Sequence, residues 1–277
     1  MRFVHSFWTP PKFSGDIHID RVLECDVLYY AYSFACLKRL EQEVVLYTDD
    51  MGAEILSFIP YDEVHLTLND IPENANHNMW ACGKFFAMKN EPLNSIHIDG
   101  DMFIETKECL DEIIKQYETN DIIVQDIEKN VSYRNYSYLT EAGVKTPNYS
   151  ISLITDSCCT GIIGFNNQQL KDKYIEQYFS LFEQIRENEK LKTVDKNFII
   201  DLVCEQYFLK CLCDTLNYSV GVLIKKYLTR YDESKKLGFV HLMGVEKYGA
   251  QAKLDNYRNK LCILSPNLFL EYIKKTT

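Results

Sequence analysis

Short apolar segments alternate with helical segments along the first half of the chain, and this alternation most constrains the fold. Residues 2–8, 44–47, 95–98 and 122–124 have the apolar, β-prone composition of strands. Wholly apolar strands are typical of parallel sheets that are covered by helices on both faces. The pattern therefore predicts an α/β fold with a mostly parallel, doubly wound sheet.

Helical periodicity fills the intervals between these strands. Val27, Tyr30, Phe34 and Leu37 recur at spacings of three and four, so they share one face of a helix over residues 20–40. The second half of the chain is less regular, and we expect a single domain over residues 1–277. There the sequence predicts strands near 161–165 and 238–242, helices over 170–185, 196–216 and 250–275 with a break at Pro266, and a charged loop over 229–236.

Charge and hydropathy exclude several classes of protein. The chain has 30 basic and 40 acidic residues, a formal net charge of -10, and no cluster of Lys and Arg that could follow a phosphate backbone, which argues against nucleic-acid binding. No apolar run approaches the ~18 residues of a membrane span. The first residues lack the basic and then apolar pattern of a secretory signal. We expect a cytoplasmic protein whose ten cysteines are reduced and mostly buried, with only peripheral membrane contact left open, for instance through residues 269–275.

Two carboxylates follow the strand at 95–98 directly. Asp99 and Asp101 flank Gly100, a residue that can adopt unusual backbone angles. Ligands of doubly wound sheets bind beyond the carboxyl ends of the strands, so both carboxylates could reach one divalent cation there. The alternative is a solvated turn in which an Asp caps the next helix.

A second polar motif follows the strand expected at 238–242. His241 could supply an imidazole to a metal such as manganese, and Lys247 could pair with a phosphate as a point charge. Taken alone, this segment is more typical of a strand-end His and a surface Lys. Combined with the two aspartates, His241 supplies a third metal ligand.

These motifs resemble those of the retaining glycosyltransferases of family eight and their relatives. The similarity covers residues 95–104 and the H-x-x-G-x-x-K pattern at His241, Gly244 and Lys247. It implies the GT-A fold, with a nucleotide-binding half over 1–127 and an acceptor half over 128–277. It also implies Mn²⁺ or Mg²⁺ on Asp99, Asp101 and His241, with Gly100, Gly244 and Lys247 on the donor diphosphate side.

The resemblance extends to weaker positions. Lys84 stands where the family has a donor-contacting Arg, although an exposed helix Lys is the alternative. Cys159 replaces the Asn of an N-x-G-V strand, and Glu205-Gln206 is similar to the D-Q pair on the reacting face of the sugar site. The residues implied to hold the base and ribose end the first two strands, where packing is the alternative for the aromatic ones: Ser6, Phe7, Tyr47, Thr48 and Asp49.

Together these features predict a metal-dependent glycosyltransferase of polysaccharide biosynthesis. Its donor is a nucleotide-diphosphate sugar, with a UDP-sugar favoured, and its acceptor is a glycan, a lipid-linked glycan or another hydroxyl. Resemblance favours retention, but the departures at Lys84 and Cys159 leave inversion open, with Glu205 as the general base. One alternative is a nucleotidyltransferase, although residues 9–12 lack its Gly-rich phosphate loop. The other is a nucleotide-sugar-binding protein without catalysis.

Overall fold

A seven-stranded sheet in the order β3-β2-β1-β4-β7-β6-β8 forms the centre of the protein. The computed structural model describes residues 1–13, 19–75, 79–129, 136–149, 156–192, 200–242 and 251–276. Within that part, six strands of the sheet run parallel and β7 runs antiparallel to both its neighbours. The predicted mostly parallel sheet is confirmed. The strands are β1 (Arg2–Phe7), β2 (Glu43–Thr48), β3 (Glu63–His65), β4 (Ser95–Ile98), β6 (Ile122–Glu128), β7 (Ser157–Phe165) and β8 (Val220–Val222).

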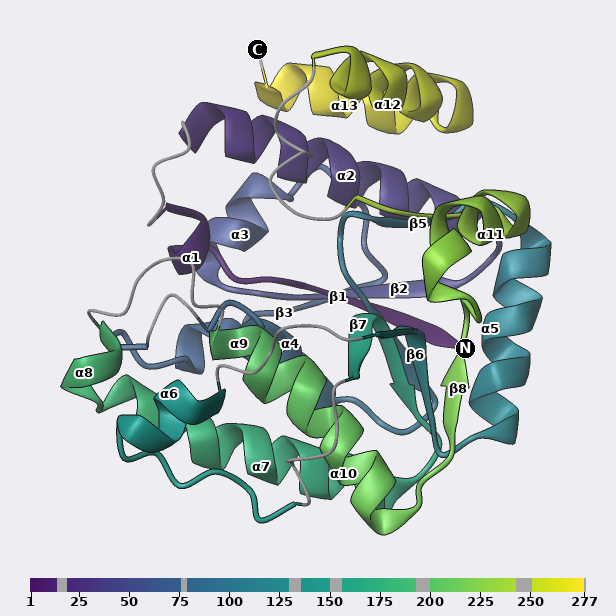
Figure 1. The fold of residues 1–277 in the computed structure, drawn as a ribbon. Coiled ribbons are helices and arrows are strands. Elements are labelled where there is room, and N and C mark those ends of the chain that lie inside the picture. The colour runs from purple at the N-terminus through teal and green to yellow at the C-terminus, as the bar shows by residue number, and fades with distance from the viewer. Residues whose placement is uncertain are drawn as a thin grey trace.

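Helices cover both faces of this sheet, as expected for an α/β fold. In Figure 1, α2 lies on one face with α12 and α13 stacked beyond it, and α4, α7 and α10 lie on the other. The helices are α1 (Pro10–Phe13), α2 (Ile19–Arg39), α3 (Asp50–Ile55), α4 (Cys82–Asn90), α5 (Lys107–Thr119), α6 (Tyr136–Glu141), α7 (Gln168–Arg186), α8 (Glu189–Lys192), α9 (Ile200–Leu202), α10 (Phe208–Leu216), α11 (Arg230–Leu237), α12 (Gln251–Leu264) and α13 (Pro266–Thr276), with 3₁₀ turns at Thr67–Asp70 and Tyr227–Thr229. None of the described helices combines the length and apolar character needed to cross a bilayer.

Strand alternation divides the core into two clusters. Phe3, Phe7 and Val44 pack under α2, whereas Val4 and Val45 pack against the helices of the opposite face. Successive strand residues point to opposite sides, so a strand buried on both faces must be apolar at nearly every position. This explains why residues 44–47 of β2 show no polar alternation, whereas the polar residues His5 and Ser6 of β1 are hydrogen-bonded to other side chains.

A two-stranded antiparallel ribbon joins distant parts of the chain above the sheet. It consists of β5 (Met102–Ile104), which follows β4, and β9 (Phe239–His241) from the C-terminal half. The charged loop predicted over 229–236 is wrong, because residues 230–237 form α11. Gly238 ends that helix at φ +74°, which leads the chain directly into β9. The ribbon fixes the position of His241.

The strand order reverses between β1 and β4, where the connections leave in opposite directions along the sheet. Ligands of such sheets bind in the crevice beyond the carboxyl ends of the strands at this reversal. Asp99 follows β4 directly at that place. Because β7 runs antiparallel, its first residues lie at the same edge as the carboxyl ends of β4 and β6.

Candidate metal centre at the carboxyl ends of the strands

The turn after β4 holds the two aspartates. Asp99 N–H donates to the carbonyl of Gly161 (2.8 Å), and Met102 N–H donates to the carbonyl of Asp99 (3.0 Å), which closes the turn. A Cβ at Gly100 would lie 2.2 Å from a ring carbon of Tyr30. Gly100 is not among the described residues with positive φ, so a glycine is needed here for space and not for an unusual backbone angle.

His241 reaches the aspartates through the β5–β9 ribbon. Met102 pairs with His241 in that ribbon, and Leu242 N–H donates to the carbonyl of Asp101 (3.1 Å). One ligand atom from each of Asp99, Asp101 and His241 lies within 4.8 Å of the other two. The structure therefore brings together three side chains that are separated by up to 142 positions in the sequence.

A glutamine orients the imidazole. Gln125, in the middle of β6, accepts a hydrogen bond through Oε1 from Nδ1 of His241 (2.7 Å), and Nε2 of His241 faces Oδ1 of Asp101 at 3.8 Å. Because the amide oxygen only accepts, it fixes the proton on Nδ1 and turns the Nε2 lone pair towards the carboxylates. Metal-bound histidines as a rule donate their other ring N–H to an oxygen acceptor, and the Gln125 amide oxygen provides one here. This donor set fits a divalent cation such as Mn²⁺ or Mg²⁺.

Space at the imidazole depends on another glycine. A Cβ at Gly161 would lie 2.6 Å from Sδ of Met102 and 2.8 Å from Cε1 of His241. Any side chain there would displace the imidazole or the ribbon that carries it. The small residue in β7 thus has a steric role in the geometry of the three candidate ligands.

Lys84 enters the site from α4. Its Nζ lies 3.0 Å from Oδ1 of Asp99 and 2.6 Å from Oε1 of Glu205, and it donates to the carbonyl of Thr160 (3.0 Å). The interpretation as an exposed helix Lys is wrong, since only 6% of the residue is exposed. Burial lowers the pKa of Lys84, but the carboxylates of Asp99 and Glu205 outweigh it and raise that pKa.

The ammonium group of Lys84 also holds the Asp99 carboxylate in place. Burial raises the pKa of Asp99, Lys84 lowers it, and the neighbouring carboxylates of Asp101 and Glu205 raise it further. The Lys84 ammonium contacts two carboxylates, those of Asp99 and Glu205, and Asp101 adds a third beside Asp99, so acidic groups outnumber the cation. Such a cluster favours a cation.

Glu205 lies in a π-helical turn, Val203–Tyr207, between α9 and α10. Its carboxylate is almost completely buried and also accepts a hydrogen bond from the Thr160 hydroxyl (2.6 Å), while the hydroxyl of Tyr174 donates to its carbonyl (2.9 Å). Single π-turns in helices are frequent at functional sites because they redirect one side chain. The next residue, Gln206, is partly exposed.

The residues predicted at the base and ribose end are engaged in local contacts. Asp49 caps α3 by accepting from Gly52 N–H (2.7 Å), and the Thr48 hydroxyl donates to the carbonyl of Phe7 (2.7 Å). Phe7 and Tyr47 are 1% and 3% exposed, so their rings are enclosed by protein. The Ser6 hydroxyl bonds to the buried ring of His97 (2.8 Å). Their contact with a donor stays a prediction.

Two predicted donor residues cannot be placed. Gly244 and Lys247 lie outside the described residues, which stop at 242 and resume at 251. Gln125 and Thr160, by contrast, belong to the site although sequence reasoning gave them no role. Their one signal is position, because each adjoins a strand that the sequence predicts, 122–124 or 161–165, and the structure extends both strands past these residues.

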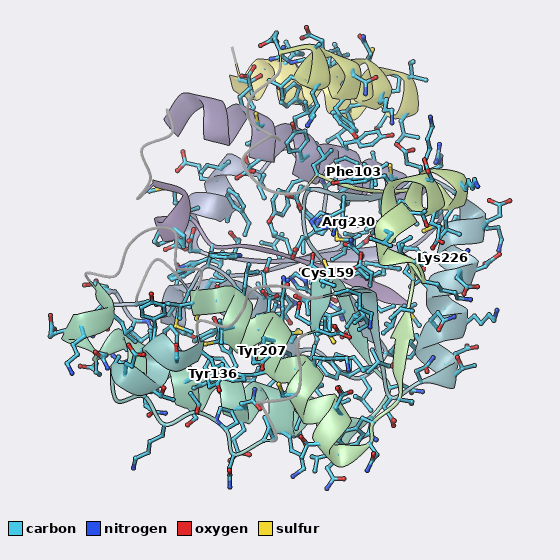
Figure 2. All side chains as sticks on the ribbon, viewed as in Figure 1. Phe103, Tyr136, Cys159, Tyr207, Lys226 and Arg230 are labelled. Atoms are coloured by element: carbon cyan, nitrogen blue, oxygen red, sulfur yellow. The ribbon has the colours of Figure 1, made fainter. Side chains whose placement is uncertain are left out.

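A cavity of about 370 Å³ adjoins the candidate ligands. His241 and Gln125 form part of its wall, and three basic residues, Arg230, Lys235 and Lys260, line it further out. Figure 2 shows Arg230 near the centre of the molecule, above Cys159. Substrate pockets in proteins have volumes of about 300–1,000 Å³.

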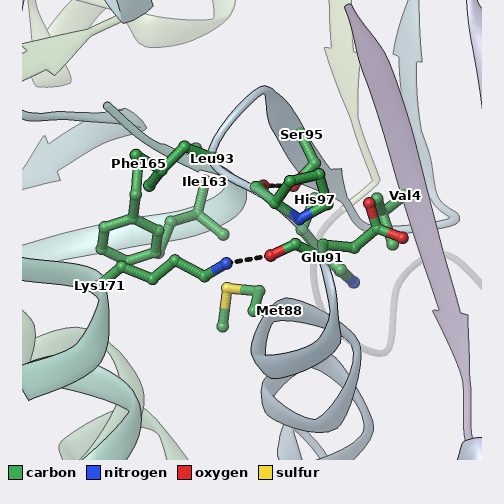
Figure 3. A pocket seen from close by; sticks show the side chains of 11 residues that line it. Val4, Met88, Glu91, Leu93, Ser95, His97, Ile163, Phe165 and Lys171 are labelled. Carbon is green, nitrogen blue, oxygen red and sulfur yellow. Dashed lines mark hydrogen bonds between the residues drawn. The ribbon is translucent and has the colours of Figure 1, made fainter. Parts of the chain in front are cut away.

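A second cavity lies below the sheet, between β4, β7 and α4. It has a volume of about 10 Å³ and is lined by, among others, Glu91, His97 and Lys171 (Figure 3). Lys171 Nζ donates to the carbonyl of Glu91, which closes one side. That volume holds one water molecule at most, so this cavity is not a substrate site.

A protein-family model matches residues 1–275 of this sequence. The chain belongs to DUF6734, a family of unknown function. No curated protein matches the sequence. The DUF6734 match covers both the strand–Asp99 segment and the His241 segment, so all three candidate ligands fall within one family unit.

Proposed function

We propose that this protein is a metal-dependent glycosyltransferase that takes a sugar from a nucleotide-diphosphate donor, with a UDP-sugar favoured. One observation carries the proposal: Asp99, Asp101 and His241 converge within 4.8 Å at the carboxyl edge of a mostly parallel sheet. An α/β sheet with such an edge agrees with the GT-A fold that the sequence motifs imply. A hard divalent cation held by few protein ligands has positions left for diphosphate oxygens.

The charge of the leaving nucleotide is the main chemical problem in this reaction. Mn²⁺ or Mg²⁺ would neutralise that charge when bound. Gln125 keeps His241 oriented for this purpose, and Lys84 keeps Asp99 in place. Arg230, Lys235 and Lys260 line the cavity beside the triad. Arg230 pairs with Glu128 and Lys260 with Glu105, so a bound diphosphate would compete with these carboxylates for the two cations.

Glu205 acts in this proposal as a positioning residue for Lys84. Its Oε1 contacts both Lys84 and Thr160, and the side chain is 2% exposed. Because this oxygen already contacts the Lys84 ammonium and the Thr160 hydroxyl and is enclosed by protein, it does not face an incoming acceptor, which favours retention over inversion by a Glu205 base. Gln206, partly exposed on the same turn, is the better placed of the two residues for a contact with bound sugar.

A thermal-shift panel of nucleotide sugars, with Mn²⁺ and with a chelator, tests the proposal. We expect one donor to stabilise the protein only in the presence of metal, by about 2.7 kcal/mol at a hundred times its Kd. Asp101→Asn should abolish that shift. Asp111→Asn, at an exposed acid that pairs with Lys107, should keep it. The absence of any metal-dependent shift across the panel would contradict the proposal.

Turnover separates the remaining classes. Release of the free nucleoside diphosphate, dependent on Mn²⁺ and reduced at least about a hundredfold in Asp101→Asn, supports a transferase. Release of pyrophosphate from a nucleoside triphosphate and a sugar phosphate would instead support a nucleotidyltransferase. Donor binding that is metal-dependent but never followed by turnover would support the binding protein.

A further inference from the structure

A second group of candidate ligands lies beside the triad, on strands β6 and β7. Asp126, Glu128 and Cys159 each offer one ligand atom, and these atoms lie within 4.8 Å of one another. None of the three belongs to the Asp99–Asp101–His241 set. We propose that Asp126, Glu128 and Cys159 form a second cation site, selective for a borderline-soft divalent ion of the Zn²⁺ class.

A register shift between β6 and β7 creates this group. The pairing passes from Val124 opposite Ile163 to Asp126 opposite Cys159, so β7 contains two more residues than β6 over this stretch. Irregularities of this kind re-aim side chains and are over-represented beside active sites.

The shift also changes which face the following residues occupy. Val124 and Ile127 both pack into the core on the α4 side, although their spacing of three would place them on opposite faces of a regular strand. Asp126 and Glu128 consequently point to the other face. The ion pair of Glu128 with Arg230 of α11 (3.2 Å) agrees with this orientation.

An orphaned oxygen gives independent support for a ligand. Asp126 is completely buried, and its Oδ1 has no hydrogen-bond partner among the described residues. Its Oδ2 accepts from Nε2 of Gln125 at 3.3 Å. A buried carboxylate oxygen without a partner is costly, so such an atom calls for a donor or a cation. A divalent ion between Asp126 and Cys159 would supply that partner.

The donor sets distinguish the two sites chemically. Two carboxylates with an imidazole suit a hard or borderline ion such as Mn²⁺, whereas a thiolate selects Zn²⁺ or Cd²⁺ over Mg²⁺ and Mn²⁺. On binding, the bond from Cys159 Sγ to its proton breaks, a bond from Sγ to the ion forms, and the proton passes to the buffer. Glu128 would exchange the Arg230 guanidinium for the ion.

Titration with Cd²⁺ alone, under a thiol-free reductant, tests the second site directly. A cadmium–thiolate bond gives an ultraviolet charge-transfer band, and we expect about one equivalent of Cd²⁺ to produce it, with Zn²⁺ competing for the same site. All ten cysteines lie in the described part of the chain, and Cys262 is the exposed one among them. Cys262→Ser is therefore the matched control and should keep the band, whereas Cys159→Ser should lose it.

Three further variants keep the test decisive if Cys159→Ser folds poorly. Glu128→Gln should retain the band and weaken Cd²⁺ binding about tenfold or more, since it removes one ligand. Arg230→Met should tighten binding, because it removes a competing cation. Asp101→Asn should change neither the charge-transfer band nor the affinity for Cd²⁺, which separates this site from the proposed transferase centre.

Several outcomes would overturn the inference. They are the absence of a band in the wild-type protein, a band that survives in Cys159→Ser, a band that disappears in Cys262→Ser, or unchanged affinity in both Glu128→Gln and Arg230→Met. Each outcome bears only on the second site, because the nucleotide-sugar experiment above is done with Mn²⁺.

Discussion

Two regions of the same sheet edge use polar residues in different ways. At the ends of β1 and β2, Thr48 and Asp49 bond to backbone groups of Phe7, Thr9 and Gly52. Beyond β4, β6 and β7, charged and polar side chains from separate parts of the chain contact one another. That second group comprises Lys84, Asp99, Asp101, Gln125, Thr160, Glu205 and His241.

The difference lies in what each arrangement does for the fold. Backbone capping satisfies groups that would otherwise be left unbonded, so it stabilises the structure. Buried charges that meet from distant segments cost desolvation free energy, and their mutual attraction rarely exceeds that cost. The second arrangement is typical of functional sites, where the cost is balanced by binding or catalysis. Each prediction below tests this division.

The largest expected effect is on stability at Lys84. Lys84→Met should lower the free energy of unfolding by about 3–5 kcal/mol, because it leaves Asp99 and Glu205 without their shared cation. Chemical denaturation measures this. Lys107→Met is the matched control, at an exposed ion pair with Asp111, and should change stability by about 1 kcal/mol at most. A loss at Lys84 no larger than in that control would show that its ion pairs are not buried in solution.

Acid should destabilise the protein through buried histidines, one of which, His5, lies in β1. Burial lowers the pKa of His5 to about 3, and its two ring nitrogens contact Tyr61 and Ser33. The folded state binds a proton at His5 less readily than the unfolded state does. The contribution of neutral His5 to the free energy of unfolding is therefore fully present above about pH 6.5. It is lost as the pH falls from there towards 3.

The measurement is unfolding at a series of pH values. As the pH falls below 6.5, protonation linked to His5 should lower the free energy of unfolding by up to about 1.4 kcal/mol per pH unit. The His5→Asn variant, whose amide does not titrate, should show a flatter profile. Burial also lowers the pKa of His97, so part of the slope should remain in that variant. Identical profiles for the variant and the wild type would contradict the role given to His5.

Sequence pattern predicted the elements well where burial and periodicity agree. The strand at 95–98 matches β4, the helix at 20–40 matches α2, and the break at Pro266 separates α12 from α13. The sequence predicts a loop over 229–236 because most of its residues are charged. It forms α11 with no buried side chain among its described residues, so it had no apolar face for a periodicity argument to detect.

The candidate site was partly predictable for a related reason. The three candidate ligands each lie in or close to a strand that the sequence predicts, so they could be named as candidates before the structure was known. They are Asp99, Asp101 and His241. Lys84 was a candidate through the family resemblance alone, and its contact with Asp99 depends on how α4 packs against the sheet. Gln125 contacts His241 at the β6–β7 register shift and leaves no local pattern in the sequence. The antiparallel direction of β7 also depends on pairing between distant residues, which periodicity does not encode.

Gln125 tests the orientation of the candidate metal ligand. Gln125→Leu removes the acceptor that holds Nδ1 of His241, so metal affinity should fall about tenfold or more. Titration of Mn²⁺ by calorimetry measures this. Gln116→Leu, at a glutamine of α5 that bonds only within its helix region, should leave the affinity unchanged. Unchanged affinity in Gln125→Leu would mean that His241 is not held through Gln125 when metal is bound.

The smallest expected effect is at Asp49, and it probes the β1–β2 side of the comparison. Asp49→Ala removes the acceptor for Gly52 N–H at the start of α3 and for Thr9, so stability should fall by about 1 kcal/mol. Asp49→Asn keeps one acceptor oxygen for Gly52 N–H but turns its NH2 group towards Thr9 N–H, so its stability should be no higher than that of Asp49→Ala by more than about 1 kcal/mol. If Asp49 serves the fold alone, neither variant should alter the Kd for the donor identified with Mn²⁺. A donor Kd that rises in both Asp49 variants, measured at a temperature at which each is fully folded, would place the ribose at this residue, and both ends of the edge would be functional.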